Sequence, residues 1–222
     1  MRLVFLSTSH GNTNKEVIKQ IKSWINPNGE VVYFFSSPDP SHKYLADVAG
    51  WFKNAIGLEN MTYLDANSTA EEIAGLQSAG AVYLSGGNTY HLLQALRDTG
   101  AGELVRQLAT ETETPIIGVS AGGLCLTRDI RAALAENDAR VTDFTGLELV
   151  DFGFYPHYKS NEASRAEINA FIGLTGTEEV LALPEYSGLA VSGDGLVPLG
   201  EVLRFVKGSS HPEALVGRNK ER

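Results

Sequence analysis

Short β-rich runs alternate with helix-like segments through the first 120 residues of the chain. The runs expected as strands are 2–7, 31–37, 61–65, 80–87 and 115–120, and the segments expected as helices are 15–25, 44–56, 69–79 and 89–100. Successive strands with helices between them pair in parallel, because each connection crosses one face of the sheet. The alternation therefore predicts an α/β fold with a doubly wound, mostly parallel sheet and helices on both faces.

The later part of the chain is less regular. Two further strands and one helix are expected at 147–155, 179–184 and 161–173. Residues 188–208 resemble short strands and turns, and the turn sequence "SGDG" within them favours a terminal β-hairpin. No linker-like run, charge block or repeat divides the sequence, so we expect residues 1–222 to form a single domain.

Charge and composition argue against several classes of partner. The 222 residues carry a formal net charge of −9, and so acidic a chain repels phosphate backbones, which makes a nucleic-acid partner unexpected. No apolar run approaches the roughly 20 residues that span a bilayer, so no membrane association is expected either. The first apolar run is too short for a signal peptide, and Cys125 is the only cysteine. We therefore expect a cytoplasmic protein without an internal disulfide.

The sequence "GVSAGG", residues 118–123, has the features of a nucleophile elbow. It places Ser120 between Gly118 and Gly122, directly after an expected strand, in the G-x-S-x-G pattern. Such a serine sits on a sharp strand-to-helix turn, where side chains at the flanking positions would clash. A strand-to-helix turn without catalytic function would have the same pattern, so the hypothesis depends on a base and an oxyanion site.

The segment "LSGGNT", residues 84–89, offers backbone amides at another strand end. We expect the N–H of Gly87, with the N–H of Ala121 after the nucleophile, to form the oxyanion hole. A simple turn is the alternative. The segment is too short for a dinucleotide fingerprint and lacks the lysine of a P-loop.

His157 is the preferred candidate for the base. It lies in "FGFYPHYKSN", after a proline and between aromatic residues, where an imidazole can be held at a fixed angle. A packed core histidine is the alternative. The other four histidines lie on an expected helix or in polar loops: His10, His42, His91 and His211.

A carboxylate is needed to orient the imidazole. Asp151 and Glu162 are near His157 in sequence, but Glu185 in "LALPEYSG" is the better candidate because it follows a strand that should end at the same edge. An exposed loop glutamate is the alternative reading. No His/Cys/Asp cluster has metal-ligand spacing, so no metal or other cofactor is expected.

Four motifs in register, "GGNTY", "GVSAGG", "PHY" and "LPE", resemble dipeptidase E, the aspartyl dipeptidase family of serine peptidases that also contains the cyanophycinases. The resemblance extends from "RLVFLS" to "FVKG". It implies a sheet of the class I glutamine amidotransferase type and a nucleophile, base and acid in the order Ser120, His157, Glu185. One departure is Gly123, where the family usually has alanine, which suggests extra flexibility beside the nucleophile.

The resemblance also implies a substrate. The family cleaves dipeptides, and some longer peptides, after an N-terminal aspartate. Arg165 in "NEASRAEI" matches the family's arginine in that region, and a bidentate guanidinium suits a carboxylate; a solvated helix-face arginine is the alternative. Asp138 falls near a family aspartate that is a rival candidate for the acid.

We therefore predict a serine-type hydrolase that releases N-terminal aspartate from small peptides through an acyl-enzyme. An esterase or amidase of the same fold acting on non-peptide acyl groups is one alternative. A small-molecule binding protein without turnover is another. The sequence leaves open whether the chain forms a homodimer.

Overall fold

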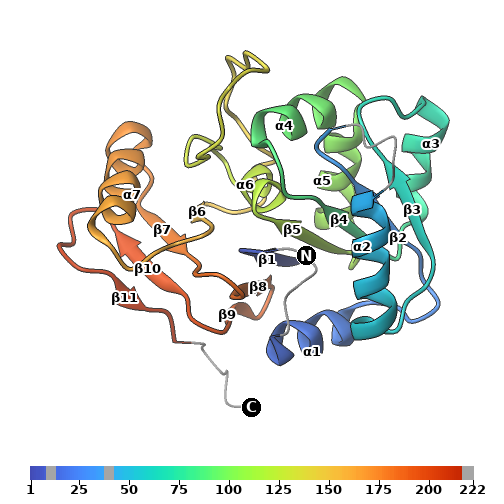
Figure 1. The fold of residues 1–222 in the computed structure, drawn as a ribbon, viewed down its shortest axis with the longest axis horizontal. Helices are drawn as coiled ribbons and strands as arrows, with labels where there is room; N and C mark the ends of the chain where they lie inside the picture. Colours follow the sequence, from blue (N-terminus) through green and yellow to red (C-terminus); the bar gives the residue numbers. More distant parts are fainter. Residues whose placement is uncertain (9–13, 38–42, 217–222) are drawn as a thin grey trace.

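The computed structural model describes residues 1–8, 14–37 and 43–216, and Figure 1 shows how its elements are arranged. A central sheet has the strand order β3-β2-β4-β5-β1-β8-β9. Its strands are β1 (Arg2–Leu6), β2 (Val31–Phe34), β3 (Met61–Leu64), β4 (Ala81–Leu84), β5 (Pro115–Val119), β8 (Gly188–Ser192) and β9 (Gly195–Leu199). The first five in the sheet order run parallel, and β8 and β9 are antiparallel to their neighbours. The predicted α/β fold with a mostly parallel sheet is confirmed.

Helices cover both faces of this sheet (Figure 1). One face carries α1 (Lys15–Trp24), α2 (Lys43–Trp51) and the π-helical turn η1 (Phe52–Ile56). The other carries α3 (Ala70–Ala74), the 3-10 turn η2 (Gly75–Ser78), α4 (Thr89–Asp98), α5 (Ala101–Glu111) and α6 (Ala121–Leu126). Because side chains alternate along a strand, β4 sends Val82 and Leu84 into one hydrophobic core and Ala81 and Tyr83 into the other.

A second, smaller sheet lies beside the first, at the left of Figure 1. Its strands are β6 (Gly153–Tyr155), β7 (Glu179–Ala182), β10 (Leu203–Val206) and β11 (Glu213–Ala214), in the order β11-β10-β7-β6, and α7 (Glu162–Thr175) connects β6 to β7. The strands β6 and β7 are parallel. The ring of Phe154 on β6 packs 5.2 Å from that of Phe5 on β1, which joins the two sheets through the core. The sequence did not predict that these strands form a sheet of their own.

Some elements differ from the sequence-based expectation. The expected strand at 147–155 is a strand only from Gly153, because the preceding residues contribute Leu147 and Leu149 to the core as irregular chain. Helix α5 was not predicted; it begins at once after Gly100, which adopts a left-handed conformation with φ of 76°. The strands β8 and β9 pair across Gly193 and Asp194, and two further strands follow them. Within the described ranges, no helix has the length and apolar content needed to cross a bilayer.

Candidate active site

Ser120 lies at the carboxyl end of β5, in the turn that leads into α6. Its backbone has φ of 46° and ψ of −103°, a conformation that side-chain-bearing residues rarely adopt. Two hydrogen bonds hold the turn: the N–H of Ser120 donates to the carbonyl of Leu6 at 2.8 Å, and the N–H of Gly122 donates to that of Ser85 at 2.9 Å. This is the strained strand-to-helix turn expected of a nucleophile elbow.

The glycines around Ser120 allow helix α6 to approach the sheet closely. A Cβ on Gly118 would lie 2.7 Å from the backbone of Gly122, and a Cβ on Gly122 would lie 2.3 Å from the carbonyl oxygen of Leu84. A Cβ on Gly123 would lie 2.5 Å from the ring of Phe154. The glycine at 123 is therefore explained by packing against β6, and the expected gain in flexibility is not needed to account for it.

His157 follows β6 and reaches Ser120 from the second sheet. Its Nε2 lies 2.9 Å from the Oγ of Ser120. The backbone of His157 also has a positive φ, of 57°, and its N–H donates to the Oγ of Ser7 at 2.8 Å. Ser7 is fully buried at the carboxyl end of β1, so it anchors the histidine backbone to the central sheet. The sequence analysis missed Ser7; its position directly after the first expected strand was the available signal.

Glu185 lies behind the imidazole. Its Oε1 is 2.8 Å from Nδ1 of His157, and the two side chains are 47% and 37% exposed. With Glu185 accepting a hydrogen bond from Nδ1–H, Nε2 is left to accept one from the Ser120 hydroxyl. The structure thus brings together the three residues that the sequence singled out, in a hydrogen-bonded series from hydroxyl to carboxylate.

The two candidate oxyanion donors lie in the loop after β4 and at the start of α6. A Cβ on Gly86 would lie 3.8 Å from the Cβ of Ser120, which places the loop after β4 against the nucleophile. Gly87 follows with φ of 114° and is exposed. Ala121 is the first residue of α6, so its N–H precedes the intrahelical hydrogen bonds.

Asp138 is held away from His157, because its carboxylate is engaged elsewhere. Its Oδ1 lies 3.0 Å from Nε2 of His91 and accepts a hydrogen bond from Nδ2 of Asn88 at 3.1 Å. The hydrogen bond from His91 is the main cause that holds the pKa of Asp138 below its usual range. The carboxylate therefore stays ionised beside the residue that caps α4.

Arg165 lies in the first turn of α7, the helix that follows the loop of His157. Its side chain is exposed, and it forms no ion pair among the described residues. The structure does not bring it into contact with Ser120 or His157. Glu162 is exposed at the start of the same helix, and Asp151 lines a cavity that does not include His157. Neither carboxylate is hydrogen-bonded to the imidazole.

Two of the other histidines, His10 and His42, lie outside the described residues. His211 bonds the hydroxyl of its neighbour Ser210 in an exposed turn. Across the described ranges, no group of three or more His, Cys, Asp or Glu side chains converges as metal ligands would.

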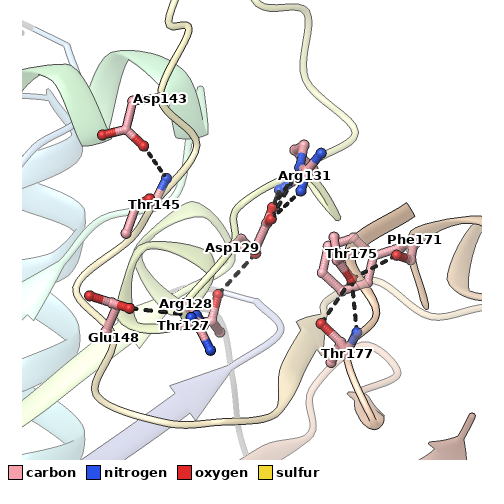
Figure 2. Close-up of polar contacts among 10 residues, drawn as sticks. All are labelled: Thr127, Arg128, Asp129, Arg131, Asp143, Thr145, Glu148, Phe171, Thr175 and Thr177. Atoms are coloured by element: carbon pink, nitrogen blue, oxygen red, sulfur yellow. Dashed lines mark hydrogen bonds and ion pairs between the residues drawn. The ribbon is translucent and has the colours of Figure 1, made fainter. Parts of the chain in front are cut away.

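A cavity of about 790 Å³ lies away from these groups, between the chain that follows α6 and the carboxyl end of α7. Figure 2 shows that polar side chains around it pair with one another: Arg128 lies 3.6 Å from Glu148, and the hydroxyl of Thr175 donates to that of Thr177 at 2.8 Å. Neither Ser120, His157 nor Glu185 lines this cavity. The three candidate residues therefore lie outside this cavity, at the ends of strands.

Comparison with known proteins identifies the family. The sequence profile described as Peptidase family S51 matches residues 3–198. Peptidase E of Streptomyces coelicolor is 29% identical over 233 aligned residues, which cover 98% of this chain and 92% of that protein. A Drosophila melanogaster protein named probable alpha-aspartyl dipeptidase is 32% identical over 134 residues, which are 57% of this chain and 55% of that protein.

A solved structure shares the fold. The crystal structure of a peptidase E-type protein from Listeria monocytogenes EGD-e superposes with a TM-score of 0.66 at 22% identity, over 89% of this chain and 96% of that one. The resemblance found in the motifs is confirmed by the family profile and by relatives that carry the peptidase E name. The chain belongs to peptidase family S51.

Proposed function

We propose that this peptidase is a serine exopeptidase that hydrolyses dipeptides, and short peptides, with N-terminal aspartate through an acyl-enzyme. The observation that carries the proposal is the series Ser120 Oγ, His157 and Glu185, joined at 2.9 Å and 2.8 Å. A hydroxyl, a base within hydrogen-bond reach and a carboxylate that orients the base are the parts that nucleophilic catalysis requires.

The proposed reaction has two stages. The Oγ of Ser120 attacks the carbonyl carbon of the peptide while Nε2 of His157 takes the hydroxyl proton. The imidazolium, stabilised by Glu185, then gives this proton to the leaving amine, and the acyl-enzyme forms. Water attacks the ester with His157 again as base, which releases aspartate and restores the serine.

The oxyanion of each tetrahedral intermediate is assigned to the amides of Gly87 and Ala121. Ala121 follows Ser120 directly, and Gly87 follows Gly86, where an added Cβ would lie 3.8 Å from the Cβ of Ser120. A preorganised pair of N–H donors stabilises the charge that develops in the transition state more than the neutral carbonyl. The strained backbone of Ser120 supports this assignment, because it presents the hydroxyl at the strand end rather than inside the turn.

The preference for aspartate is assigned to Arg165. The relatives named peptidase E and probable alpha-aspartyl dipeptidase suggest the substrate. The guanidinium on the first turn of α7 is exposed and has no ion pair with a described residue, so it can bind a carboxylate. In this role Arg165 binds the aspartate side chain of the substrate, so it does not need to contact Ser120. A cytoplasmic location fits the single, buried Cys125.

Hydrolysis of a panel of X-Leu dipeptides, with X as Asp, Glu, Asn or Ala, tests the proposal. Ser120→Ala serves as the blank, because it removes the nucleophile and leaves the fold intact. Cleavage of Asp-Leu alone, absent in the variant, is the expected result. Hydrolysis of simple nitrophenyl esters in preference to every dipeptide would identify an esterase. Binding of a dipeptide without an acylation burst would identify a protein that does not turn over.

A further inference from the structure

Two buried hydroxyls bind the same backbone carbonyl in the loop after β4. The Oγ of Ser36 donates to the carbonyl oxygen of Gly86 at 3.0 Å, and the Oγ of Ser85 donates to it at 2.8 Å. Ser36 comes shortly after β2 and Ser85 directly after β4, and the two serines are only 3% and 2% exposed. A carbonyl that receives two hydroxyl protons uses both of its lone pairs, so its direction is fixed by these two side chains.

The two serines are themselves held by hydrogen bonds that extend the pairing of β2 with β4. The N–H of Ser85 donates to the carbonyl of Phe34 at 3.0 Å, and the N–H of Ser36 donates to the Oγ of Ser85 at 2.9 Å. The Oγ of Ser85 therefore accepts from Ser36 and keeps its proton for Gly86. The carbonyl of Ser85 accepts from the N–H of Gly122 at 2.9 Å, which bonds the same loop to α6.

The carbonyl of Gly86 belongs to the same peptide group as the N–H of Gly87, one of the two candidate oxyanion donors. This peptide is trans, so its C=O and N–H point in opposite directions. Strands β2 and β5 lie on opposite sides of β4. A carbonyl directed at Ser36, on the β2 side, therefore sends the N–H of Gly87 toward the β5 side, where Ser120 lies. Gly87 is exposed, and its N–H donates to no other described residue.

A peptide between two glycines needs such anchors. Neither glycine carries a side chain, so the peptide group can rotate and present its N–H to either side at little steric cost. The hydroxyls of Ser36 and Ser85 select one of these orientations. A Cβ on Gly87 would lie 2.3 Å from the Oγ of Ser36, so the loop packs directly on this hydroxyl. Hydrogen bonds to the carbonyl also polarise the peptide group and strengthen its N–H as a donor.

We propose that Ser36 and Ser85 are positioning residues of the oxyanion hole, which hold the carbonyl of Gly86 and thereby aim the N–H of Gly87 at the oxyanion formed on Ser120. The inference rests on the proposed function and adds to it two residues that touch neither the substrate nor the reacting atoms. The oxyanion exists only after the serine has attacked, so its stabilisation lowers the barrier without tightening the binding of the substrate. The loss of these hydroxyls should therefore reduce kcat and leave KM unchanged.

The test compares kcat and KM for Asp-Leu in the wild type, in Ser36→Ala and in the double variant Ser36→Ala/Ser85→Ala. Because removal of a whole oxyanion donor costs about 10²- to 10³-fold in kcat, we expect losses of about 5- to 10-fold for Ser36→Ala and about 30- to 100-fold for the double variant. Ser36→Ala removes one oxygen and leaves the bond from Ser85 to Gly86, so this variant should fold. Calorimetry should give the same Kd for Asp-Leu in Ser120→Ala with and without Ser36→Ala, because no oxyanion forms there.

Ser78→Ala is the control. The hydroxyl of Ser78 also donates to a backbone carbonyl, that of Gly75, at 3.0 Å, but both residues belong to η2, which precedes the opposite end of β4. The kcat of this variant should match that of the wild type. An unchanged kcat in Ser36→Ala, an equal fall in Ser36→Ala and Ser78→Ala, or a higher KM in place of a lower kcat overturns the inference.

The rate at which diisopropyl fluorophosphate phosphorylates Ser120, followed by mass spectrometry, separates this inference from the proposed function. The phosphoryl oxygen of this reagent gains negative charge as the serine attacks and fluoride leaves, and no aspartate is involved. If the wild type cleaves no Asp-X dipeptide, the proposed function fails, and slower labelling of Ser36→Ala than of the wild type and Ser78→Ala still supports the inference. Equal rates in the three proteins, or no labelling of the wild type, overturn it.

Discussion

The carboxylate of Glu185 lies 2.8 Å from Nδ1 of His157 because two short parallel strands end side by side. Tyr155 at the end of β6 is in register with Ala182 at the end of β7. The N–H of Leu183 then donates to the carbonyl of Tyr155 at 3.0 Å, which continues the pairing beyond the strands. The residues that follow each strand are thereby placed as neighbours.

Ser120, in contrast, ends a strand of the central sheet. The packing between the two sheets, which includes the rings of Phe5 and Phe154, therefore sets the distance between Ser120 and His157. The hydrogen bond from the N–H of His157 to the Oγ of Ser7 also ties the histidine to the central sheet, and so helps to hold it at this distance from Ser120. A change at the contact between the sheets should affect the proposed chemistry without touching any of the three residues.

Glu185→Gln should reduce kcat for Asp-Leu far more than Asp138→Asn. An amide in place of Glu185 cannot stabilise the imidazolium, and we expect a loss of about 10²- to 10⁴-fold. Asp138 bonds His91 and Asn88 instead of His157, so its amide should cost less than about threefold. Steady-state kinetics of both variants measures the ranking, and the reverse ranking would move the acid to Asp138.

Arg165→Met should reduce kcat/KM for Asp-Leu by about 10- to 100-fold, as expected for the loss of a charge-assisted, bidentate contact. Hydrolysis of Ala-Leu should change little. Arg165→Lys keeps the charge without the planar fork and should fall between the two. Arg128→Met, at another exposed arginine, is the control and should match the wild type. An equal loss on Asp-Leu and Ala-Leu would show that Arg165 supports the fold only.

The five parallel strands of the central sheet and most of the helices on its faces were predictable because each carries its own local signal. β4 and β5 are short apolar runs, and α1 shows apolar residues at helical spacing. Thr69 caps α3 in a reciprocal arrangement with Glu72, three residues along the chain. These features depend on residues close together in sequence.

The second sheet was not predictable in this way. β6 has only three residues, and its partner β7 follows after the whole of α7, so their pairing depends on tertiary packing. The positive φ of His157 and its bond to Ser7, 150 residues earlier, leave no local pattern either. The candidate base and acid were found from their place at strand ends, although the sheet to which those strands belong was not foreseen.

Alkaline pH should destabilise the fold partly through Tyr155, whose hydroxyl meets Glu167 of α7. Burial, with Glu167 as the second cause, raises the pKa of Tyr155 to about 12. An unfolded tyrosine ionises near pH 10, so this contribution to the free energy of unfolding is complete below about pH 10 and is lost between about pH 10 and 12.

Urea unfolding at several pH values measures this effect. Tyr155→Phe should flatten the loss of unfolding free energy between about pH 10 and 12, and Glu167→Gln should flatten it in part, because only one of the two causes is removed. If the free energy of unfolding falls equally in the wild type and in Tyr155→Phe over this pH range, Tyr155 does not link stability to pH.

Gly123→Ala should destabilise the protein and disturb the site together. The added methyl would lie 2.5 Å from the ring of Phe154, so either α6 or β6 has to move, and we expect a cost of about 1–3 kcal/mol. A movement of α6 would displace the turn of Ser120, and a movement of β6 would displace His157. We therefore expect kcat to fall together with the free energy of unfolding. Denaturant unfolding and Asp-Leu hydrolysis measure both.

Two further variants test this explanation of Gly123→Ala. A Cβ on Gly173, in the last turn of α7, would meet no atom within 4 Å, so Gly173→Ala should raise the free energy of unfolding by about 0.5–1 kcal/mol. Phe154→Leu makes room for the methyl, and the double variant with Gly123→Ala should cost less than the sum of the two single changes. Strict additivity would show that the ring is not what excludes alanine, because contacting residues are expected to couple.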